Sequence, residues 1–397
     1  MVRHDFDTVL DRRHTHSLKW DHCRDTFGLD DVIPMWVADM DFAAPPAVVR
    51  AVERRAAHGA YGYVSVPESF WESAIAWLAR RHQWTVNRRW LHRAPGVVPA
   101  LSLCVNAFTD PGDGIVVQTP VYYPFFHAIE KNGRRLVRNP LLADGGTFRM
   151  DLADLERKLD DRTRMLILCS PHNPVGRVWT RPELEALGEI CIRRDVVVLS
   201  DEIHMDLTLP GHTHVPLATV SPALAERTVT CVAPSKTFNL AGLSMSLVVA
   251  GNRDLLARYE AQFDAAGLEI ANLFGTVALE EAYRSGDEWL DQLLEYLAAN
   301  VDFAERFMRE RIPALRFIRP EGTFLALIDC RGLGMPQKEL DGFFLRTARV
   351  YFDSGPWFGE EATGFERINL ACPRATLAEA LQRMERVVTE RLAAGSR

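Results

Sequence analysis

The fold is decided by one stretch of the chain, which contains Met165-Leu-Ile-Leu-Cys169, then Thr180-Arg-Pro-Glu183, then Val196-Val-Val-Leu199. The two apolar runs are short and nearly uninterrupted, which is typical of strands buried on both faces of a parallel sheet. Between them, Thr180 and Glu183 form a capping-box pattern with proline in the first turn, which marks the start of a helix. A strand, a helix and a second strand in this order make the crossover unit of a doubly wound sheet.

Working outward, similar apolar runs at Ile115–Val117 and Thr228–Val232 extend the sheet on both sides, and residues 70–78 have the spacing of an amphipathic helix. From about residue 285 the pattern changes to a long helical stretch, several short strands and a last helix at about residues 377–392. A chain of this length suits two domains that share a site.

We therefore expect an α/β protein. Residues 46–284 are predicted to form a large domain with a mainly parallel central sheet. Residues 1–45, which look loop-like, and residues 285–397 are predicted to form a smaller α+β domain together.

Composition narrows the class of protein. The chain has 397 residues, 47% of them hydrophobic and 25% charged, and its net charge of −7 comes from well-mixed signs. We expect no nucleic-acid partner, which would favour a basic face, and no membrane segment, because no uncharged apolar stretch approaches about 18 residues. Seven cysteines without a Cys-x-x-Cys pair, and an N-terminus without an apolar signal region, favour a reduced cytoplasmic protein.

Three polar side chains follow the ends of predicted strands. Asn173 lies in Ser170-Pro-His-Asn-Pro-Val-Gly176, Asp201 in Ser200-Asp-Glu-Ile-His204, and Lys236 in Ala233-Pro-Ser-Lys-Thr-Phe-Asn239. In α/β sheets, ligands bind outside the carboxyl ends of the strands, so one pocket could collect all three side chains.

An amine, a carboxylate and an amide suit one cofactor in particular. A lysine amine condenses with an aldehyde, a carboxylate keeps a pyridine nitrogen protonated, and an asparagine amide hydrogen-bonds a phenolate oxygen. Together these three demands belong to pyridoxal 5'-phosphate (PLP).

In order and spacing, these motifs resemble the fold type I aminotransferase superfamily of PLP-dependent enzymes over nearly the whole chain. Within it, Pro34-Met-Trp-Val-Ala-Asp-Met-Asp-Phe42 and Ser200-Asp-Glu-Ile-His-Met-Asp206 look like the cystathionine β-lyase, or carbon–sulfur lyase, branch. The resemblance implies the fold type I fold, with a large PLP-binding domain and a smaller α+β domain.

It also implies roles for single residues around the cofactor. Lys236 matches the lysine that holds PLP as a Schiff base and later acts as general base. Asp201 matches the partner of the pyridine nitrogen, and Asn173 the partner of O3′. Tyr122 matches the aromatic ring that stacks on the cofactor, with Tyr123 as the neighbouring alternative.

The substrate residues by resemblance are Arg374, in Asn369-Leu-Ala-Cys-Pro-Arg374, whose fork suits the α-carboxylate, and Ala38. For the phosphate, the resemblance implies backbone amides at Val97 and Val98 after Gly96, together with the hydroxyl of Ser235. Either Tyr61 or Tyr63 should reach the phosphate of the neighbouring subunit. We therefore expect a homodimer with composite active sites.

Three positions depart from the pattern of many relatives. Ser244 stands where they carry a phosphate-pairing arginine, and Ala233 stands where they often carry serine. His204 replaces a tyrosine near O3′, where it could tune the cofactor or simply pack. The scattered histidines, including His212 and His214, lack the context of metal ligands, so we expect no metal site.

The branch resemblance favours β-elimination on cystathionine or another cysteine S-conjugate, which gives a thiol, pyruvate and ammonia. A PLP-dependent aminotransferase that uses a 2-oxo acid is the alternative, because both reactions employ the same motif residues. A regulatory protein with a vestigial site is the remaining alternative, and the retention of the lysine, aspartate, asparagine and arginine disfavours it.

Overall fold

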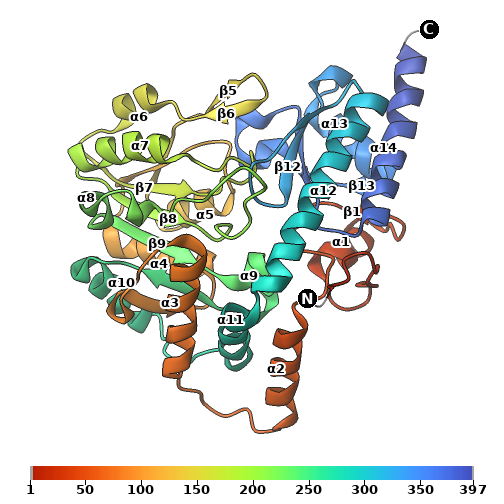
Figure 1. Cartoon of the computed structure of the whole chain (residues 1–397). Coiled ribbons are helices and arrows are strands. Elements are labelled where there is room, and N and C mark those ends of the chain that lie inside the picture. Colours follow the sequence, from red (N-terminus) through yellow and green to blue (C-terminus); the bar gives the residue numbers. More distant parts are fainter. Residues whose placement is uncertain (1–2, 396–397) are drawn as a thin grey trace.

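The computed structural model describes residues 3–395, so the outermost ends of the predicted small domain lie outside the described residues. A seven-stranded sheet forms the centre of the first half of the fold (Figure 1). In spatial order its strands are β2 (Leu91–Ala94), β10 (Ser246–Val249), β9 (Thr228–Val232), β8 (Val197–Asp201), β7 (Thr163–Cys169), β3 (Gly114–Val117) and β4 (Arg135–Arg138). Only β10 runs antiparallel to its neighbours, so the sheet is mainly parallel as predicted.

Helices cover both faces of this sheet, as the near-continuous apolar strands require. Within β3, Ile115 and Val117 pack into the cluster on one face and Val116 into the cluster on the other. The first face is covered by α4 (Val97–Phe108), α5 (Pro124–Glu130) and α10 (Arg253–Ala265), and the second by α6 (Leu152–Lys158), α7 (Arg181–Arg193) and α8 (Pro222–Ala225). The capping box predicted at Thr180 and Glu183 starts α7.

A third group of helices packs beside this sheet. The helices α2 (Pro46–Ala57) and α3 (Glu68–His82) both contact α11 (Leu273–Ser285), and the short α9 (Pro234–Thr237) also contacts α11. The connection between α2 and α3 projects from the body at the bottom of Figure 1.

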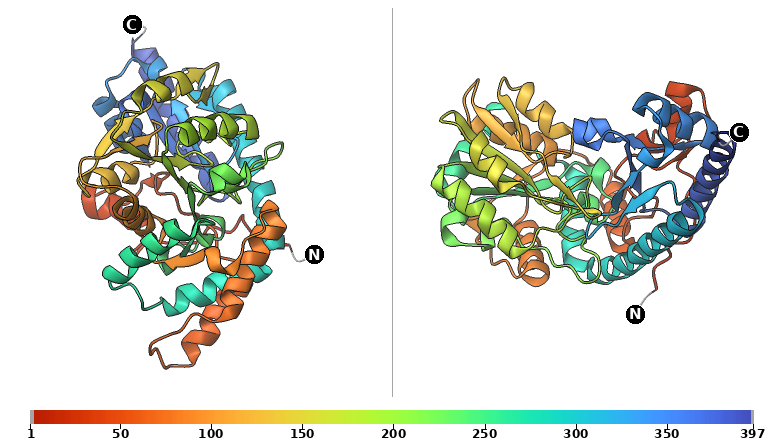
Figure 2. Two further views of the ribbon diagram at one scale, coloured as in Figure 1. Left: turned by 90° about the vertical axis from the view of Figure 1, so that its left-hand side faces the viewer. Right: turned by 90° about the horizontal axis from the view of Figure 1, so that it is seen from above.

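The second half of the fold contains a separate sheet (Figure 2). Its antiparallel strands, in spatial order, are β11 (Arg316–Ile318), β12 (Leu325–Asp329), β15 (Phe365–Asn369) and β14 (Asp353–Ser354). The long helices α12 (Asp287–Arg311) and α14 (Arg374–Gly395) contact each other, and α13 (Gln337–Phe343) lies between β12 and β13 in the chain. A small hairpin, β5 (Leu142–Asp144) and β6 (Thr147–Arg149), lies outside both sheets.

The N-terminal segment joins this second half. Its strand β1 (Ile33–Pro34) pairs in parallel with β13 (Val350–Tyr351), which attaches the N-terminal segment to the second half of the fold. The segment also contains the helix α1 (Leu18–Phe27), which the sequence analysis treated as loop. The domain limits at residues 46–284 stay a prediction.

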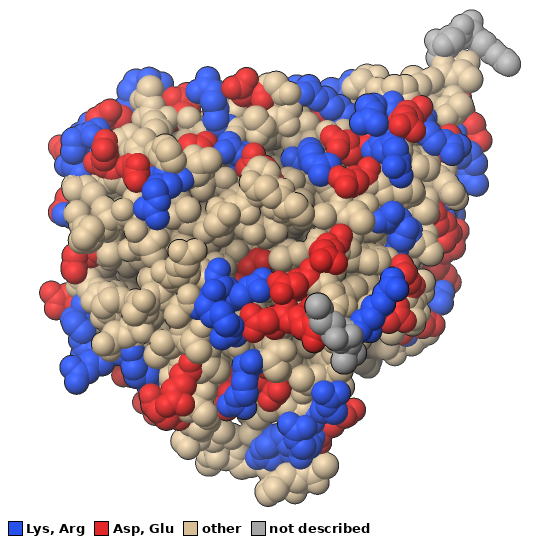
Figure 3. Space-filling model, in the orientation of Figure 1, with Lys and Arg blue, Asp and Glu red and all other residues tan. Residues whose placement is uncertain are grey.

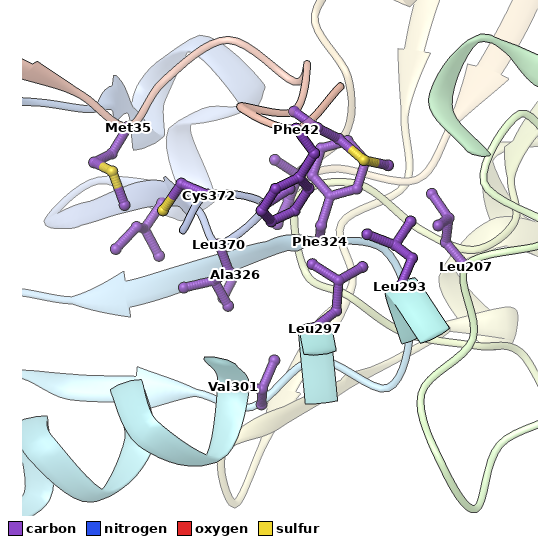
Figure 4. Close-up of a cluster of buried hydrophobic side chains, with 14 of the residues drawn as sticks. Met35, Phe42, Leu207, Leu293, Leu297, Val301, Phe324, Ala326, Leu370 and Cys372 are labelled. Atoms are coloured by element: carbon purple, nitrogen blue, oxygen red, sulfur yellow. The ribbon is translucent and has the colours of Figure 1, made fainter. Parts of the chain in front are cut away.

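One apolar cluster joins the two halves. Figure 4 shows Leu293, Leu297 and Val301 of α12 lying near Phe324, Ala326 and Leu370, with Leu207 from the loop after β8 at one end. Because this core is continuous, the loops that follow the strands of the large sheet are held against the second half.

Surface charge and helix composition are the features relevant to nucleic-acid and membrane binding. On the face that Figure 3 shows, acidic and basic side chains are interspersed. Among residues 3–395, no helix combines the length and the apolar character that crossing a membrane requires.

Candidate active site

A cavity of about 210 Å³ lies where the carboxyl ends of β7 and β8 meet the start of α4 and the short helix α9. It collects side chains from segments far apart in the sequence. Its lining residues include Ala38, Gly96, Val97, Val98, Tyr122, Asn173, Asp201, His204, Ser235, Lys236 and Ser244. Most residues singled out from the sequence therefore share one cavity, because parallel strands end at the same edge of a sheet.

Lys236 is the only lysine of the cavity lining. Its Nζ donates a hydrogen bond of 2.7 Å to the carbonyl oxygen of Ala38. Burial lowers the pKa of this amine to about 8, and the positive charge of Arg367 acts in the same direction, while Asp39 and Asp201 oppose it. An amine with this pKa is neutral in about a tenth of the molecules at pH 7, far more often than an ordinary lysine, and nucleophilic attack or proton abstraction requires the neutral form.

Asp201 ends β8 and is buried. Its Oδ1 accepts a hydrogen bond of 3.1 Å from the backbone N–H of Ile203. Burial raises the pKa of this carboxyl to about 7, although that hydrogen bond and the charge of Lys236 lower it. A cationic ring nitrogen beside Asp201 would stabilise its ionised form.

Asn173 is fixed by an arginine that the sequence analysis did not single out. Arg367, in β15, donates from one terminal nitrogen to Asn173 Oδ1 (2.9 Å) and from the other to the carbonyl oxygen of Trp36 (2.8 Å) and to Asp353. Because Oδ1 is occupied, the NH2 group of Asn173 is the part of the amide left to donate to a ligand. Arg367 is buried, and its Nε has no hydrogen-bond partner among the described residues.

The structure places Arg374, the arginine predicted to bind the substrate, outside the cavity lining. Arg374 begins α14, where its Nε donates to Asn300 Oδ1 (2.7 Å) and its guanidinium lies over the ring of Phe303. It neither lines the cavity nor bonds to a residue that does. Arg367, seven residues earlier in the chain, does bond to a residue of the cavity lining, Asn173.

The start of α4 provides free backbone donors. No side chain caps this helix, so the N–H groups of Val97 and Val98 remain available at its positive end. Gly96 has a φ of 141°, a conformation that favours glycine. The hydroxyls of Ser235 and Ser244 line the same cavity, so this end suits a phosphate.

Tyr122 and His204 complete the described wall. Burial raises the pKa of Tyr122 and lowers that of His204 well below its ordinary value, so both side chains are neutral. The buried Nδ1 of His204 has no partner among the described residues. Tyr123 lies beside Tyr122, with its ring edge-on to Trp357 and Phe358, and does not line the cavity.

Comparison with known proteins identifies the family of this chain. The family model for aminotransferase class I and II matches residues 30–384. The chain belongs to the aminotransferase class I and II family. Cystathionine beta-lyase PatB of Bacillus subtilis (strain 168) is 43% identical over 381 residues, which cover 96% of this chain and 98% of PatB.

Two solved structures are similar over the same length. Cystalysin from Treponema denticola, whose crystal structure contains a pyridoxal 5'-phosphate cofactor, is 36% identical with a TM-score of 0.94, covering 98% of this chain and 100% of cystalysin. The PLP-bound C-S lyase from Staphylococcus hominis is 32% identical with a TM-score of 0.91, covering 98% of each chain. The predicted family and the predicted fold type I fold are confirmed.

Two tyrosines of the family pattern lie away from the cavity of their own chain. Tyr61 and Tyr63 are 61% and 91% exposed, on the connection that projects between α2 and α3. The hydroxyl of Tyr61 donates to the carbonyl oxygen of Ala56. Neither side chain lines the cavity of this chain.

The residues present fit PLP. The fit rests on a buried amine, a buried carboxylate without a cation in contact, an amide with free donors and uncapped amides at a helix start. Among the described residues, no three His, Cys, Asp or Glu side chains are grouped to hold a metal ion.

Proposed function

We propose that this protein is a PLP-dependent carbon–sulfur β-lyase acting on cystathionine or another cysteine S-conjugate. In the overall reaction, one thioether and one water give a thiol, pyruvate and ammonia. The observation that carries the proposal is the cavity whose lining includes both the buried Lys236 amine and the buried Asp201 carboxylate, in a chain that resembles carbon–sulfur lyases along nearly its whole length.

The cofactor, when bound, supplies a protonated ring that accepts the electrons left behind when a Cα–H bond breaks. The chain's own residues hold the cofactor and control the positions of the protons. Asp201 keeps the proton on the ring nitrogen, because its carboxylate is desolvated there. Asn173 would donate to the ring oxygen through its NH2 group, and Tyr122, which lines the same cavity, would pack against the ring.

Lys236 holds the cofactor first and moves the Cα proton afterwards. Its lowered pKa of about 8 allows it to accept that proton near neutral pH. Arg367 is proposed to bind the substrate α-carboxylate in place of Arg374, and the carbonyl oxygen of Ala38 lies beside the reacting amine. Val97, Val98 and Ser235 are proposed to hold the phosphate.

The test separates elimination from transamination. Purified protein is incubated with cystathionine and a panel of S-substituted cysteines, without any oxo acid, and pyruvate, ammonia and thiol are measured. We expect equal amounts of the three products, and no pyruvate from the Lys236→Ala variant. A strict requirement for 2-oxoglutarate would instead establish an aminotransferase.

We also propose a homodimer with composite sites in the cytoplasm. The exposure of Tyr61 and Tyr63, away from their own cavity, supports the dimer. Seven free, buried cysteines support a reducing compartment. His204, neutral and without a partner at Nδ1, is proposed to contact the cofactor near O3′.

A further inference from the structure

A buried polar cluster lies behind the cavity and contributes no side chain to its lining. Asp206, in the loop after β8, is its centre. The Oδ1 atom accepts hydrogen bonds from Trp77 Nε1 (3.0 Å) and from His82 Nε2 (2.6 Å), both on α3. The Oδ2 atom accepts one of 2.7 Å from Thr237 Oγ1.

Thr237 is the residue that follows Lys236. Both lie in α9, a helix of four residues whose closing backbone hydrogen bond runs from Phe238 N–H to the carbonyl oxygen of Pro234. A helix this short has little stability of its own. The side-chain bond from Thr237 to Asp206 therefore ties the lysine-bearing turn to α3.

A second branch of the cluster starts beside Asp201. Glu202, fully buried, accepts at Oε1 from Ser200 Oγ (2.8 Å) and from the backbone N–H of Leu217 (3.0 Å), and its Oε2 lies 2.8 Å from His214 Nε2. The rings of His214 and His82 meet edge to face, with centroids 5.8 Å apart. The cluster thus runs from the neighbour of Asp201 to the neighbour of Lys236.

The hydrogen-bond partners of Asp206 stabilise its ionised carboxylate. Burial by itself would raise the pKa of this carboxyl, but the hydrogen bond and charge of His82 and the hydrogen bonds of Thr237 and Trp77 bring it below its ordinary value. A buried carboxylate that loses one hydrogen-bond donor is left unsatisfied, and this costs free energy. The positions of its partners, including Thr237, are therefore constrained.

We propose that Asp206 is a positioning residue for Lys236, acting through the hydroxyl of Thr237. The inference rests on the proposed function, because it concerns the lysine that the function employs. Lys236 must reach both the cofactor and the Cα proton, and small misplacements of a reacting group reduce rates steeply. The tether from Thr237 to Asp206 limits such displacement without touching the cavity.

The test removes one hydroxyl and keeps the side-chain shape. Thr237→Val should lower kcat roughly ten-fold with little change in KM. The cofactor should also dissociate faster from the variant than from wild type, as measured by trapping the apoprotein that forms. Thr237→Ser, which restores the donor, should recover both properties. Thr228→Val is the matched control. Thr228 begins β9, and its buried hydroxyl donates to the carbonyl oxygen of Leu224 in α8, so the variant should have a lower melting temperature with kcat and cofactor release unchanged.

Thr237→Ala replaces the valine variant if that protein does not fold. Wild-type kcat and wild-type cofactor release in a folded variant without the hydroxyl would overturn the proposal, even if the melting temperature falls. The release measurement needs no turnover. A wild-type protein that forms no pyruvate would therefore refute the lyase function and leave this inference to be decided by cofactor release.

Discussion

At the scale of single residues, two arginines seven positions apart have different surroundings. Arg367 lies in the buried strand β15 (Phe365–Asn369), where a charge requires a partner, and it is bonded to Asp353 and Asn173. Arg374 is bonded to Asn300 at the beginning of a helix. Motif matching favoured Arg374, whereas the burial expected of an arginine inside a strand would have favoured Arg367.

Replacement by lysine tests this assignment while keeping the charge. Arg367→Lys should reduce kcat/KM by about 1.5–3 kcal/mol of transition-state stabilisation, since lysine cannot reproduce the fork that suits a carboxylate. Arg374→Lys is the matched control and should have little effect. The measurement uses an S-substituted cysteine and the corresponding amine without a carboxylate. An equal loss with both compounds would remove Arg367 from carboxylate binding.

Asp201 gives the cofactor-free protein a defined dependence on pH. Its pKa is about 7 in the folded protein and near the ordinary 3.8 in the unfolded chain, so the folded state holds the proton more tightly. The contribution of Asp201 to the free energy of unfolding is fully present below pH 3.8. It is lost as pH rises through 7, by at most about 1.4 kcal/mol per pH unit. Asp201→Asn cannot titrate and should lack this loss.

The comparison is made by urea unfolding of both apoproteins between pH 4 and 7. The free energy of unfolding of Asp201→Asn relative to wild type should rise with pH over this range. A constant difference would mean that Asp201 is already ionised at pH 4.

At the scale of elements, a buried ion pair attaches the N-terminal segment to the site. Lys19 of α1 has no exposed surface, and its Nζ lies 2.7 Å from Asp41 Oδ2. Arg12 and the indole of Trp20 also bond to Asp41. Asp41 follows the segment whose Ala38 carbonyl accepts from Lys236, so α1 stabilises one wall of the cavity.

Asp41→Asn should lower the free energy of unfolding by about 3–5 kcal/mol, because the ammonium of Lys19 would stay buried without its closest counter-charge. The double variant Lys19→Met/Asp41→Asn removes both charges and should be more stable than the single variant. Chemical denaturation of the three proteins checks this order. If the double variant were the less stable one, burial of Lys19 would not be the source of the loss.

The sequence predicts elements well where a local signal decides them. The strand runs at residues 115–117, 165–168 and 228–232 and the capping box at Thr180 depend on neighbouring residues alone. Helix α1 was missed because its polar sequence has no clear apolar stripe; its stability comes from the Ser17 cap and the buried Lys19 pair. Asn173, Asp201 and Lys236 could be foreseen together because strand ends converge, whereas Asp206 and Arg367 depend on contacts distant in sequence.

At the scale of the whole molecule, one cavity lacks a charged phosphate partner. Ser244 stands where the resemblance led us to expect an arginine, and the lining of the described cavity contains no arginine. A phosphate carries nearly two negative charges, which further donors would stabilise. Tyr61 and Tyr63, exposed on a projecting connection, are proposed to supply hydroxyls across an interface.

Mixing two inactive variants tests whether the sites are shared between subunits. Lys236→Ala lacks the reacting amine, and Tyr61→Phe/Tyr63→Phe lacks both hydroxyls; each should be severely impaired alone. After subunit exchange, some hybrid dimers contain one site with an intact lysine from one chain and intact tyrosines from the other, so activity should partly return. Exchange is verified with differently tagged chains, and mixing Lys236→Ala with itself is the control. Verified hybrids that remain inactive would show that each chain completes its own site, and would rule out the composite dimer.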